Sequence, residues 1–144
     1  MEFLLRVYGS TREEELAMVL DWTPEQKAGF VLQQFSAQHA WYQEHYQGAQ
    51  FDVILINGVP AGRLYVHRRA SEIRLVDITL LPEFRKGGFG SSILQDLLAE
   101  GEATGKPVTI HVEIYNPAMR LYERLGFRSV EDRGVYHLMK WSPS

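Results

Sequence analysis

The chain has 144 residues, of which 45% are apolar and 23% charged; this is the size and composition of one folded domain (1–144) and excludes a disordered, collagen-like or coiled-coil protein. The net charge of −3 argues against a nucleic-acid partner, and the absence of cysteine excludes disulfides, thiolate metal ligands and a cysteine nucleophile. No apolar run is long enough to cross a membrane and residues 1–9 make a poor signal peptide, so we expect a cytoplasmic protein without a membrane partner.

The first third of the chain is predicted to be mostly helical, after an apolar start whose spacing fits either a helix or a strand. Ser10 and Thr11 precede two glutamates at the spacing of a capping box, which predicts a helix from this point to about Trp22. Thr23 is followed by a proline and, three residues on, by a glutamine, which marks the start of a second helix. This helix carries an aromatic stripe and ends at Gly48.

Strands and helices then alternate. Asn57-Gly58 predicts a tight hairpin between strands 51–56 and 61–67, because both turn positions need a positive φ. The remaining predicted elements are a strand at 72–81, a helix at 88–103, a strand at 108–115, a helix at 116–126 and two strands at 127–130 and 135–141. This order predicts a mixed α/β layer in which helices pack on a sheet.

A glycine-rich loop, residues 85–90, joins the third strand to the following helix. Its three glycines allow a sharp turn and leave backbone N–H groups uncovered, and the start of the helix adds further free donors. Together with Arg85 and Lys86 this predicts a cradle for a phosphate or pyrophosphate group. A tight turn that binds no ligand is the alternative, since glycine-rich turns are common. The loop matches neither the Walker pattern nor the dinucleotide-binding pattern.

The segment 116–127 is the second motif, and its start and end both have helix-terminus signals. Asn116-Pro117 fits an N-cap followed by a first-turn proline, and Gly126 fits a left-handed residue after the helix. By itself the segment predicts a capped amphipathic helix in which Tyr122 is a packed aromatic side chain.

Together the two motifs resemble the GNAT superfamily of N-acetyltransferases. Arg85, Gly88 and Gly90 match its acyl-CoA signature Arg/Gln-x-x-Gly-x-Gly/Ala, and residues 116–127 match its Asn…Leu-Tyr…Gly-Phe segment at the expected distance. The resemblance implies an α/β fold of the α+β type, with a mixed, mostly antiparallel sheet of about six strands and four helices on its faces. It also implies transfer of an acetyl group from acetyl-CoA to a primary amine of a small amine, an amino acid or a peptide N-terminus.

The resemblance assigns roles to individual residues. The residues expected to hold the CoA pyrophosphate are Arg85, Lys86, Gly87, Gly88, Phe89, Gly90 and Ser91. A backbone N–H near Leu80 would polarise the thioester carbonyl, Asn116 would contact the pantetheine arm, and Tyr122 would donate a proton to the departing thiolate. A non-catalytic module that only binds acyl-CoA is the alternative, and Tyr122 favours the enzyme because such a module needs no proton donor.

The sequence offers several candidates for the general base that accepts the amine proton. His111, Glu113 and Tyr115 alternate along one strand and so share a face, and His111 resembles in position the base glutamate of ribosomal-protein alanine acetyltransferases. A histidine can serve near neutral pH, but His111 also fits a half-buried strand residue. Asp77 is a further candidate, and many related enzymes use ordered water. No spacing of potential ligands suggests a metal site, so we expect no metal.

The start of the chain departs from the family pattern, which opens with a strand. Here Phe3–Ala17 favours a helix, which would remove the first strand and leave strand 51–56 as an exposed sheet edge. Two explanations fit such an edge: a partner chain covers it, as in a homodimer, or the native start lies upstream of Met1.

Charge is divided unevenly along the chain. Residues 1–58 contain 8 acidic and 3 basic side chains, whereas residues 59–144 contain 10 and 12. One interpretation is that the first part meets a cationic amine, next to the aromatic residues at 41–46, and the second meets an anionic cofactor. Chance variation on a solvated surface is the alternative.

Overall fold

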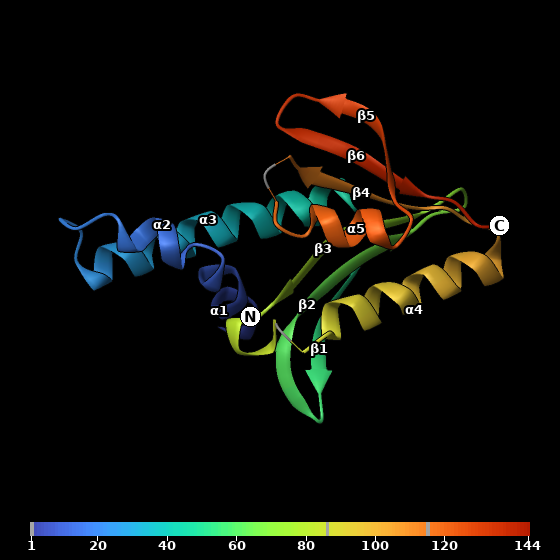
Figure 1. The fold of residues 1–144 in the computed structure, drawn as a ribbon. Coiled ribbons are helices and arrows are strands. Elements are labelled where there is room, and N and C mark those ends of the chain that lie inside the picture. Colours follow the sequence, from blue (N-terminus) through green and yellow to red (C-terminus); the bar gives the residue numbers. More distant parts are fainter. Residues whose placement is uncertain (1, 86, 115) are drawn as a thin grey trace.

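The computed structural model describes residues 2–85, 87–114 and 116–144, apart from the side chain of Arg133, and has a mixed α/β architecture (Figure 1). The helices are α1 (Glu2–Ser10), α2 (Glu13–Ala17), α3 (Pro24–His45), α4 (Phe89–Thr104) and α5 (Met119–Arg124), with a short 3-10 turn η1 (Pro82–Phe84). The strands are β1 (Gln50–Ile56), β2 (Val59–Arg68), β3 (Ile73–Leu80), β4 (Val108–Glu113), β5 (Arg128–Arg133) and β6 (Tyr136–Trp141). The prediction of six strands is confirmed, whereas the described residues form five α-helices rather than four.

The six strands form one open sheet in the order β1-β2-β3-β4-β6-β5. Every neighbouring pair is antiparallel except β3 and β4, which are parallel. The hairpin at Asn57-Gly58 has φ values of 52° and 78°, which confirms the predicted turn. The sheet is therefore mostly antiparallel, as expected.

The parallel pair β3–β4 is short and marks the centre of the sheet. Ile73–Leu75 pair with Val108–Ile110, and both strands then continue without pairing to each other. Just past this point β3 has one extra residue relative to β2, Val76, which forms a β-bulge. From Val76 and His111 onward, the facing backbone edges of β3 and β4 thus have no strand partner in the part of the chain that the structure describes.

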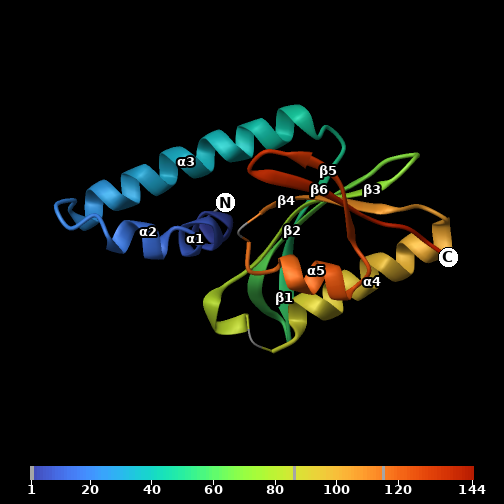
Figure 2. The same cartoon turned by 45° about the horizontal axis from the view of Figure 1, so that its top comes forward.

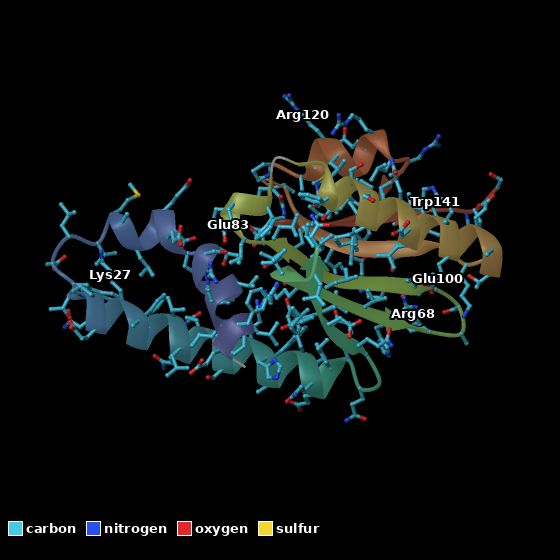
Figure 3. The ribbon with its side chains drawn as sticks, turned by 90° about the horizontal axis from the view of Figure 1, so that it is seen from below. Lys27, Arg68, Glu83, Glu100, Arg120 and Trp141 are labelled. Carbon is cyan, nitrogen blue, oxygen red and sulfur yellow. The ribbon has the colours of Figure 1, made fainter. Side chains whose placement is uncertain are left out.

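Different helices cover the two faces of the sheet. Figure 3 shows α1 and α3 on one side and α4 on the other, with the strands between them. Under α1 and α3 the core consists of Leu4, Tyr8, Phe35 and Tyr65. Under α4 and α5 it contains Leu94, Leu97, Val108, Val112, Tyr122, Phe127 and Met139. Figure 2 shows the same arrangement from another side, with α3 on one face and α4 and α5 on the other.

The prediction for residues 10–22 is wrong in its detail. The hydroxyls of Ser10 and Thr11 donate to the carbonyl oxygens of Val7 and Tyr8, each at 2.6 Å, so they close α1 and do not cap the next helix. Helix α2 has no side-chain cap and ends at Ala17 instead of Trp22. The second predicted start is confirmed: Thr23 and Gln26 exchange both hydrogen bonds of a capping box.

The expected absence of a first strand is confirmed for the described residues. The N-terminal stretch forms α1, which packs on α3 and on strands β2 and β3. Within the described residues strand β1 pairs only with β2 and lies at the edge of the sheet. Among the described residues no helix combines the length and apolar character needed to span a membrane.

Candidate active site

The glycine loop lies between the end of β3 and the first turn of α4. Gly88 occupies the N-cap position with φ of +77°, in the left-handed region that favours glycine. Among the described residues no side chain caps this helix, so the N–H groups of its first turn have no intrahelical or side-chain acceptor there. The loop can therefore present backbone donors to an anion, with the positive end of the α4 dipole behind them. Lys86 lies outside the described residues.

Arg85 is the first residue of this loop and connects it by hydrogen bonds to two other elements. Its Nε donates to the carbonyl oxygen of Leu80 at 2.9 Å, at the end of β3. Its Nη2 donates to the hydroxyl of Ser10 at 3.2 Å, at the end of α1. A guanidinium group has five N–H donors, so others remain for an anion at the loop.

Tyr122 lies on α5 with only 4% of its surface exposed. Its ring meets that of Phe127 at a centroid distance of 5.6 Å and an angle of 70°. Burial, and secondly the negative charge of Asp77, raise the pKa of Tyr122 to about 12. The hydroxyl makes no hydrogen bond to the described residues, so a neutral phenol with an available proton stands here at pH 7.

Asn116 precedes α5 but is not its N-cap as predicted. The helix begins at Met119, with Ala118 in the N-cap position. The side-chain oxygen of Asn116 accepts a hydrogen bond from the N–H of Ala118 at 2.8 Å, which forms a turn before the helix. The amide NH₂ of the exposed side chain is left to donate to another group.

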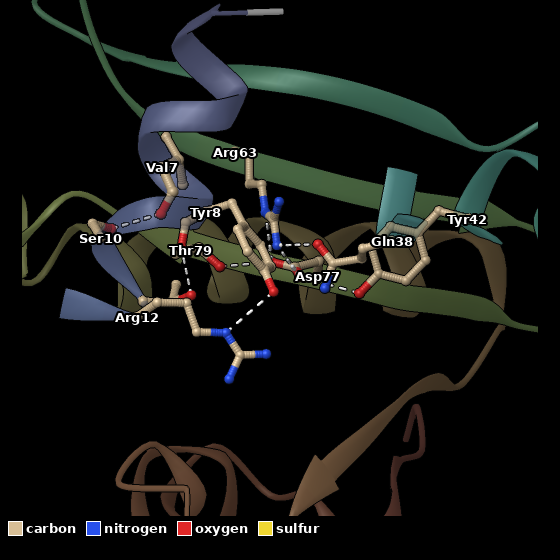
Figure 4. A network of polar contacts seen from close by, with 10 residues as sticks. Val7, Tyr8, Ser10, Arg12, Gln38, Tyr42, Arg63, Asp77 and Thr79 are labelled. Atoms are coloured by element: carbon tan, nitrogen blue, oxygen red, sulfur yellow. Dashed lines mark hydrogen bonds and ion pairs between the residues drawn. The ribbon is translucent and has the colours of Figure 1, made fainter. Parts of the chain in front are cut away.

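A buried ion pair lies on the α1–α3 side of the sheet (Figure 4). Arg63 holds Asp77 through two hydrogen bonds, Nη2 to Oδ2 at 2.8 Å and Nε to Oδ1 at 3.2 Å. Their side chains are 2% and 15% exposed. The hydroxyls of Tyr42 and Thr79 also donate to Asp77, at 3.3 and 2.7 Å. The carboxylate thus receives hydrogen bonds from three side chains and is held near the region where β3 and β4 part.

The tyrosine hydroxyl in this network stays protonated. Burial, and after it the charge of Asp77, raise the pKa of Tyr42 above the ordinary tyrosine value. Burial alone would lower the pKa of Arg63, but Asp77 outweighs it and the pKa of Arg63 is raised. The network therefore consists of one cation, one anion and neutral donors.

His111 and Glu113, the predicted bases, lie on β4. Nη1 of the buried Arg74 contacts Nδ1 of His111 at 3.2 Å, and its Nε donates to the Thr109 hydroxyl at 2.8 Å. Because an arginine side chain has no acceptor, Nδ1 of His111 accepts this hydrogen bond and carries no proton. Glu113 is exposed, and Tyr115 lies outside the described residues.

The structure thus gathers Arg85 and the glycine loop at one end of β3. The charge of Asp77 contributes to the raised pKa of Tyr122, although the two side chains share no hydrogen bond. Sequence reasoning missed Arg63, although one signal existed: an arginine in the middle of an otherwise apolar strand needs a buried counter-ion. No group of three or more potential metal ligands occurs among the described residues.

Comparison with known proteins gives a family match and several similar folds. The family described as acetyltransferase (GNAT) domain matches residues 18–143. The PaiA N-acetyltransferase of Thermoplasma acidophilum, solved with coenzyme A, has a TM-score of 0.71 at 16% identity over 98% of this chain and 91% of its own. An Elizabethkingia anophelis GNAT acetyltransferase with acetyl-CoA bound has a TM-score of 0.59 at 14% identity over 69% and 80%.

A third similar structure is the ribosomal-protein-S18-alanine N-acetyltransferase of Escherichia coli, with a TM-score of 0.61 at 22% identity over 74% of this chain and 77% of its own. By sequence, the human and mouse cysteine-rich protein 2-binding proteins are 40% identical over 50 residues, which is 35% of this chain. The match spans 6% of the length of these relatives.

Proposed function

Since the chain belongs to the GNAT family of acetyltransferases, we propose that it transfers the acetyl group of acetyl-CoA to a primary amine. The observation that carries this proposal is Tyr122, a buried neutral phenol with a pKa of about 12, whose hydroxyl makes no hydrogen bond to the described residues. A protein that only bound acyl-CoA would have no use for such a donor. The acceptor is a small amine, an amino acid or a peptide N-terminus.

The glycine loop would hold the cofactor. Residues 87–91 supply backbone N–H groups at the start of α4, and Arg85 and Lys86 add positive charge for the pyrophosphate. The Asn116 amide would bind the pantetheine arm. Coenzyme A and acetyl-CoA in two structurally similar proteins support this part of the proposal.

The reaction would proceed between β3 and β4, where the strand edges lack partners. A backbone N–H of β3, near Leu80, polarises the thioester carbonyl. The amine nitrogen bonds to the carbonyl carbon, the C–S bond breaks, and Tyr122 gives its proton to the sulfur. The amine proton passes to water, His111 or Glu113. Three side chains already donate to Asp77, so its carboxylate is engaged in the buried network with Arg63.

Acetyl-CoA should stabilise the folded protein. At a concentration of about 100 times its Kd the free energy of unfolding should rise by about 2.7 kcal/mol. For a domain of this size that is a rise in Tm of roughly 6–10 °C. Thermal denaturation with and without the cofactor measures it, and an unchanged Tm at millimolar acetyl-CoA would contradict the assignment. A panel of amines assayed by release of free CoA then tests transfer itself.

Gly88→Ala should weaken cofactor binding about tenfold, because a Cβ disfavours the left-handed backbone by about 1–2 kcal/mol and shifts the N–H groups of the loop. Gly105→Ala is the matched control. It lies at the other end of α4 with φ of +68°, and at both glycines a new Cβ would meet no atom within 4 Å. The two variants should lose similar stability, but only Gly88→Ala should bind CoA more weakly in calorimetry. Equal affinities would show that the loop is merely a turn.

A further inference from the structure

Residues 13–25, which we name the tip, form one end of the helical region. They carry large apolar side chains that are exposed to solvent. Met18 is 83% exposed and Leu20 is 88% exposed, the highest values among the large exposed apolar residues. Figures 1 and 2 both show α2 and the start of α3 projecting beyond the sheet, away from β5 and β6. Exposing two such side chains two positions apart in the chain costs solvation free energy that a bound partner would recover.

The tip is also strongly acidic. Residues 13–25 contain no lysine or arginine, and their acidic side chains are Glu13, Glu14, Glu15, Asp21 and Glu25. All five are exposed. Only Glu15 has a cationic partner among the described residues, Arg12 at 3.1 Å. Met18 and Leu20 therefore lie in a segment whose other four acidic side chains have no cationic partner among the described residues.

The negative charge of the tip restricts the kinds of partner that could cover these apolar side chains. Nucleic acids and anionic membranes carry phosphates that the carboxylates would repel. A second copy docked tip to tip would oppose like charges. A polypeptide that combines lysine or arginine with apolar side chains satisfies both features at once, because its cations meet the carboxylates while its apolar groups cover Met18 and Leu20.

A groove beside the tip fits the same partner. Leu16, two residues before Met18, lines an apolar cavity of about 300 Å³ between α1, α2 and α3, together with Leu5 and Val31. Arg6 and Lys27 also line it, and Arg6 is paired with Glu83. An apolar side chain of the partner can enter here while its cations lie against the tip.

We propose that the tip, residues 13–25, is a docking surface for a basic polypeptide segment that carries apolar side chains. The proposal rests on exposure and charge and holds whether or not acetyl transfer occurs. Affinity comes from apolar burial at Met18 and Leu20, and selection against other partners comes from the carboxylates.

The test uses a fluorescent 18-residue peptide of lysine and leucine, with a glutamate–leucine peptide of equal length as the comparison. Fluorescence anisotropy on the full chain should show binding of the basic peptide only. The variant Met18→Ser/Leu20→Ser should weaken binding about tenfold. Its control, Leu55→Ser/Val130→Ser, removes apolar residues that are 61% and 56% exposed elsewhere and should bind normally.

Charge is tested with two matched triple variants. Glu13→Gln/Glu14→Gln/Asp21→Asn should weaken binding about tenfold and reduce its salt dependence. Asp96→Asn/Glu44→Gln/Glu123→Gln removes as many exposed carboxylates away from the tip and should leave binding unchanged. All these side chains are exposed, so the variants should keep the wild-type Tm, which is measured for each.

Three results would overturn the proposal. One is equal loss of binding in the tip variants and in their controls, which would mean non-specific attraction to an acidic protein. Another is equal binding of the glutamate–leucine peptide or of neutral lipid vesicles, which would mean apolar adhesion without selection. The last is concentration-dependent dimerisation that Met18→Ser/Leu20→Ser abolishes, which would make a second copy the occupant.

Discussion

Tyr122→Phe is expected to lower kcat for acetyl transfer about 10²- to 10³-fold, while the affinity for acetyl-CoA stays within about twofold. The variant keeps the ring that packs against Phe127 and removes only the hydroxyl, so the core should be preserved. Without the proton donor the thiolate must leave as an anion, which raises the barrier of the step that breaks the C–S bond. Steady-state kinetics together with calorimetric titration of CoA separates the two quantities.

The control for this variant is Tyr136→Phe, which removes a hydroxyl from a tyrosine that is 44% exposed. It should leave kcat unchanged.

The pH profile gives a second readout: with its pKa raised to about 12, Tyr122 stays protonated through the usual assay range and should cause no alkaline loss of rate there. Because the folded state holds this proton more tightly than the unfolded state, the associated stability is present below about pH 10 and is lost as pH rises toward 12. Wild-type kcat in Tyr122→Phe would exclude the acid role.

Arg63→Met should be the most destabilising of the substitutions considered, with a loss of about 3–5 kcal/mol in the free energy of unfolding. Arg63 is 2% exposed and makes three hydrogen bonds, two to Asp77 and one to Gln38. Its removal leaves the Asp77 carboxylate without a counter-ion beneath α1 and α3. Because Asp77 keeps 15% exposure, we expect a value in the lower part of that range, measured by urea denaturation.

Arg68→Met provides the comparison for Arg63→Met. Arg68 also holds a carboxylate through two hydrogen bonds, to Glu100 at 2.6 and 2.9 Å, but these side chains are 41% and 33% exposed. Such a surface pair contributes about 0–1 kcal/mol. The double variant Arg63→Met/Asp77→Leu should recover part of the stability, since it removes the uncompensated charge. If the two arginine variants lose equal stability, burial is not what makes the Arg63–Asp77 pair important.

Elements with local signals could be predicted from the sequence. The Asn57-Gly58 turn and the Thr23 capping box depend on residues within a few positions of each other, and the structure confirms both. The error at Ser10 and Thr11 has a physical cause: a hydroxyl can cap the following helix or donate to a carbonyl of the preceding one. The outcome depends on the docking of α1 onto the sheet, which no local pattern reports.

The residues of the candidate site also differ in whether local sequence could predict them. Arg85 and Tyr122 belong to contiguous motifs, whereas the Arg63–Asp77 pair joins two strands. Strict alternation would place Asp77 on the face of Ile73 and Leu75, in the core under α4. The bulge at Val76 turns Asp77 to the other face, where Arg63 lies. The one extra residue in β3 therefore determines on which face of the sheet the Asp77 carboxylate lies. The alternation of residues in the sequence does not reveal this bulge.

The hydrogen bonds that hold α1 next to the glycine loop affect when α1 can dock during folding. Arg85 and Glu83 bond to Ser10 and Arg6 across 75 and 77 residues of sequence. On the ribosome α1 emerges before these partners, which follow only after β1, β2 and β3 have been synthesised. Closing so long a segment costs conformational entropy before the contacts repay it, so α1 docks late. Helix α1 is therefore synthesised well before the residues that fix its final position.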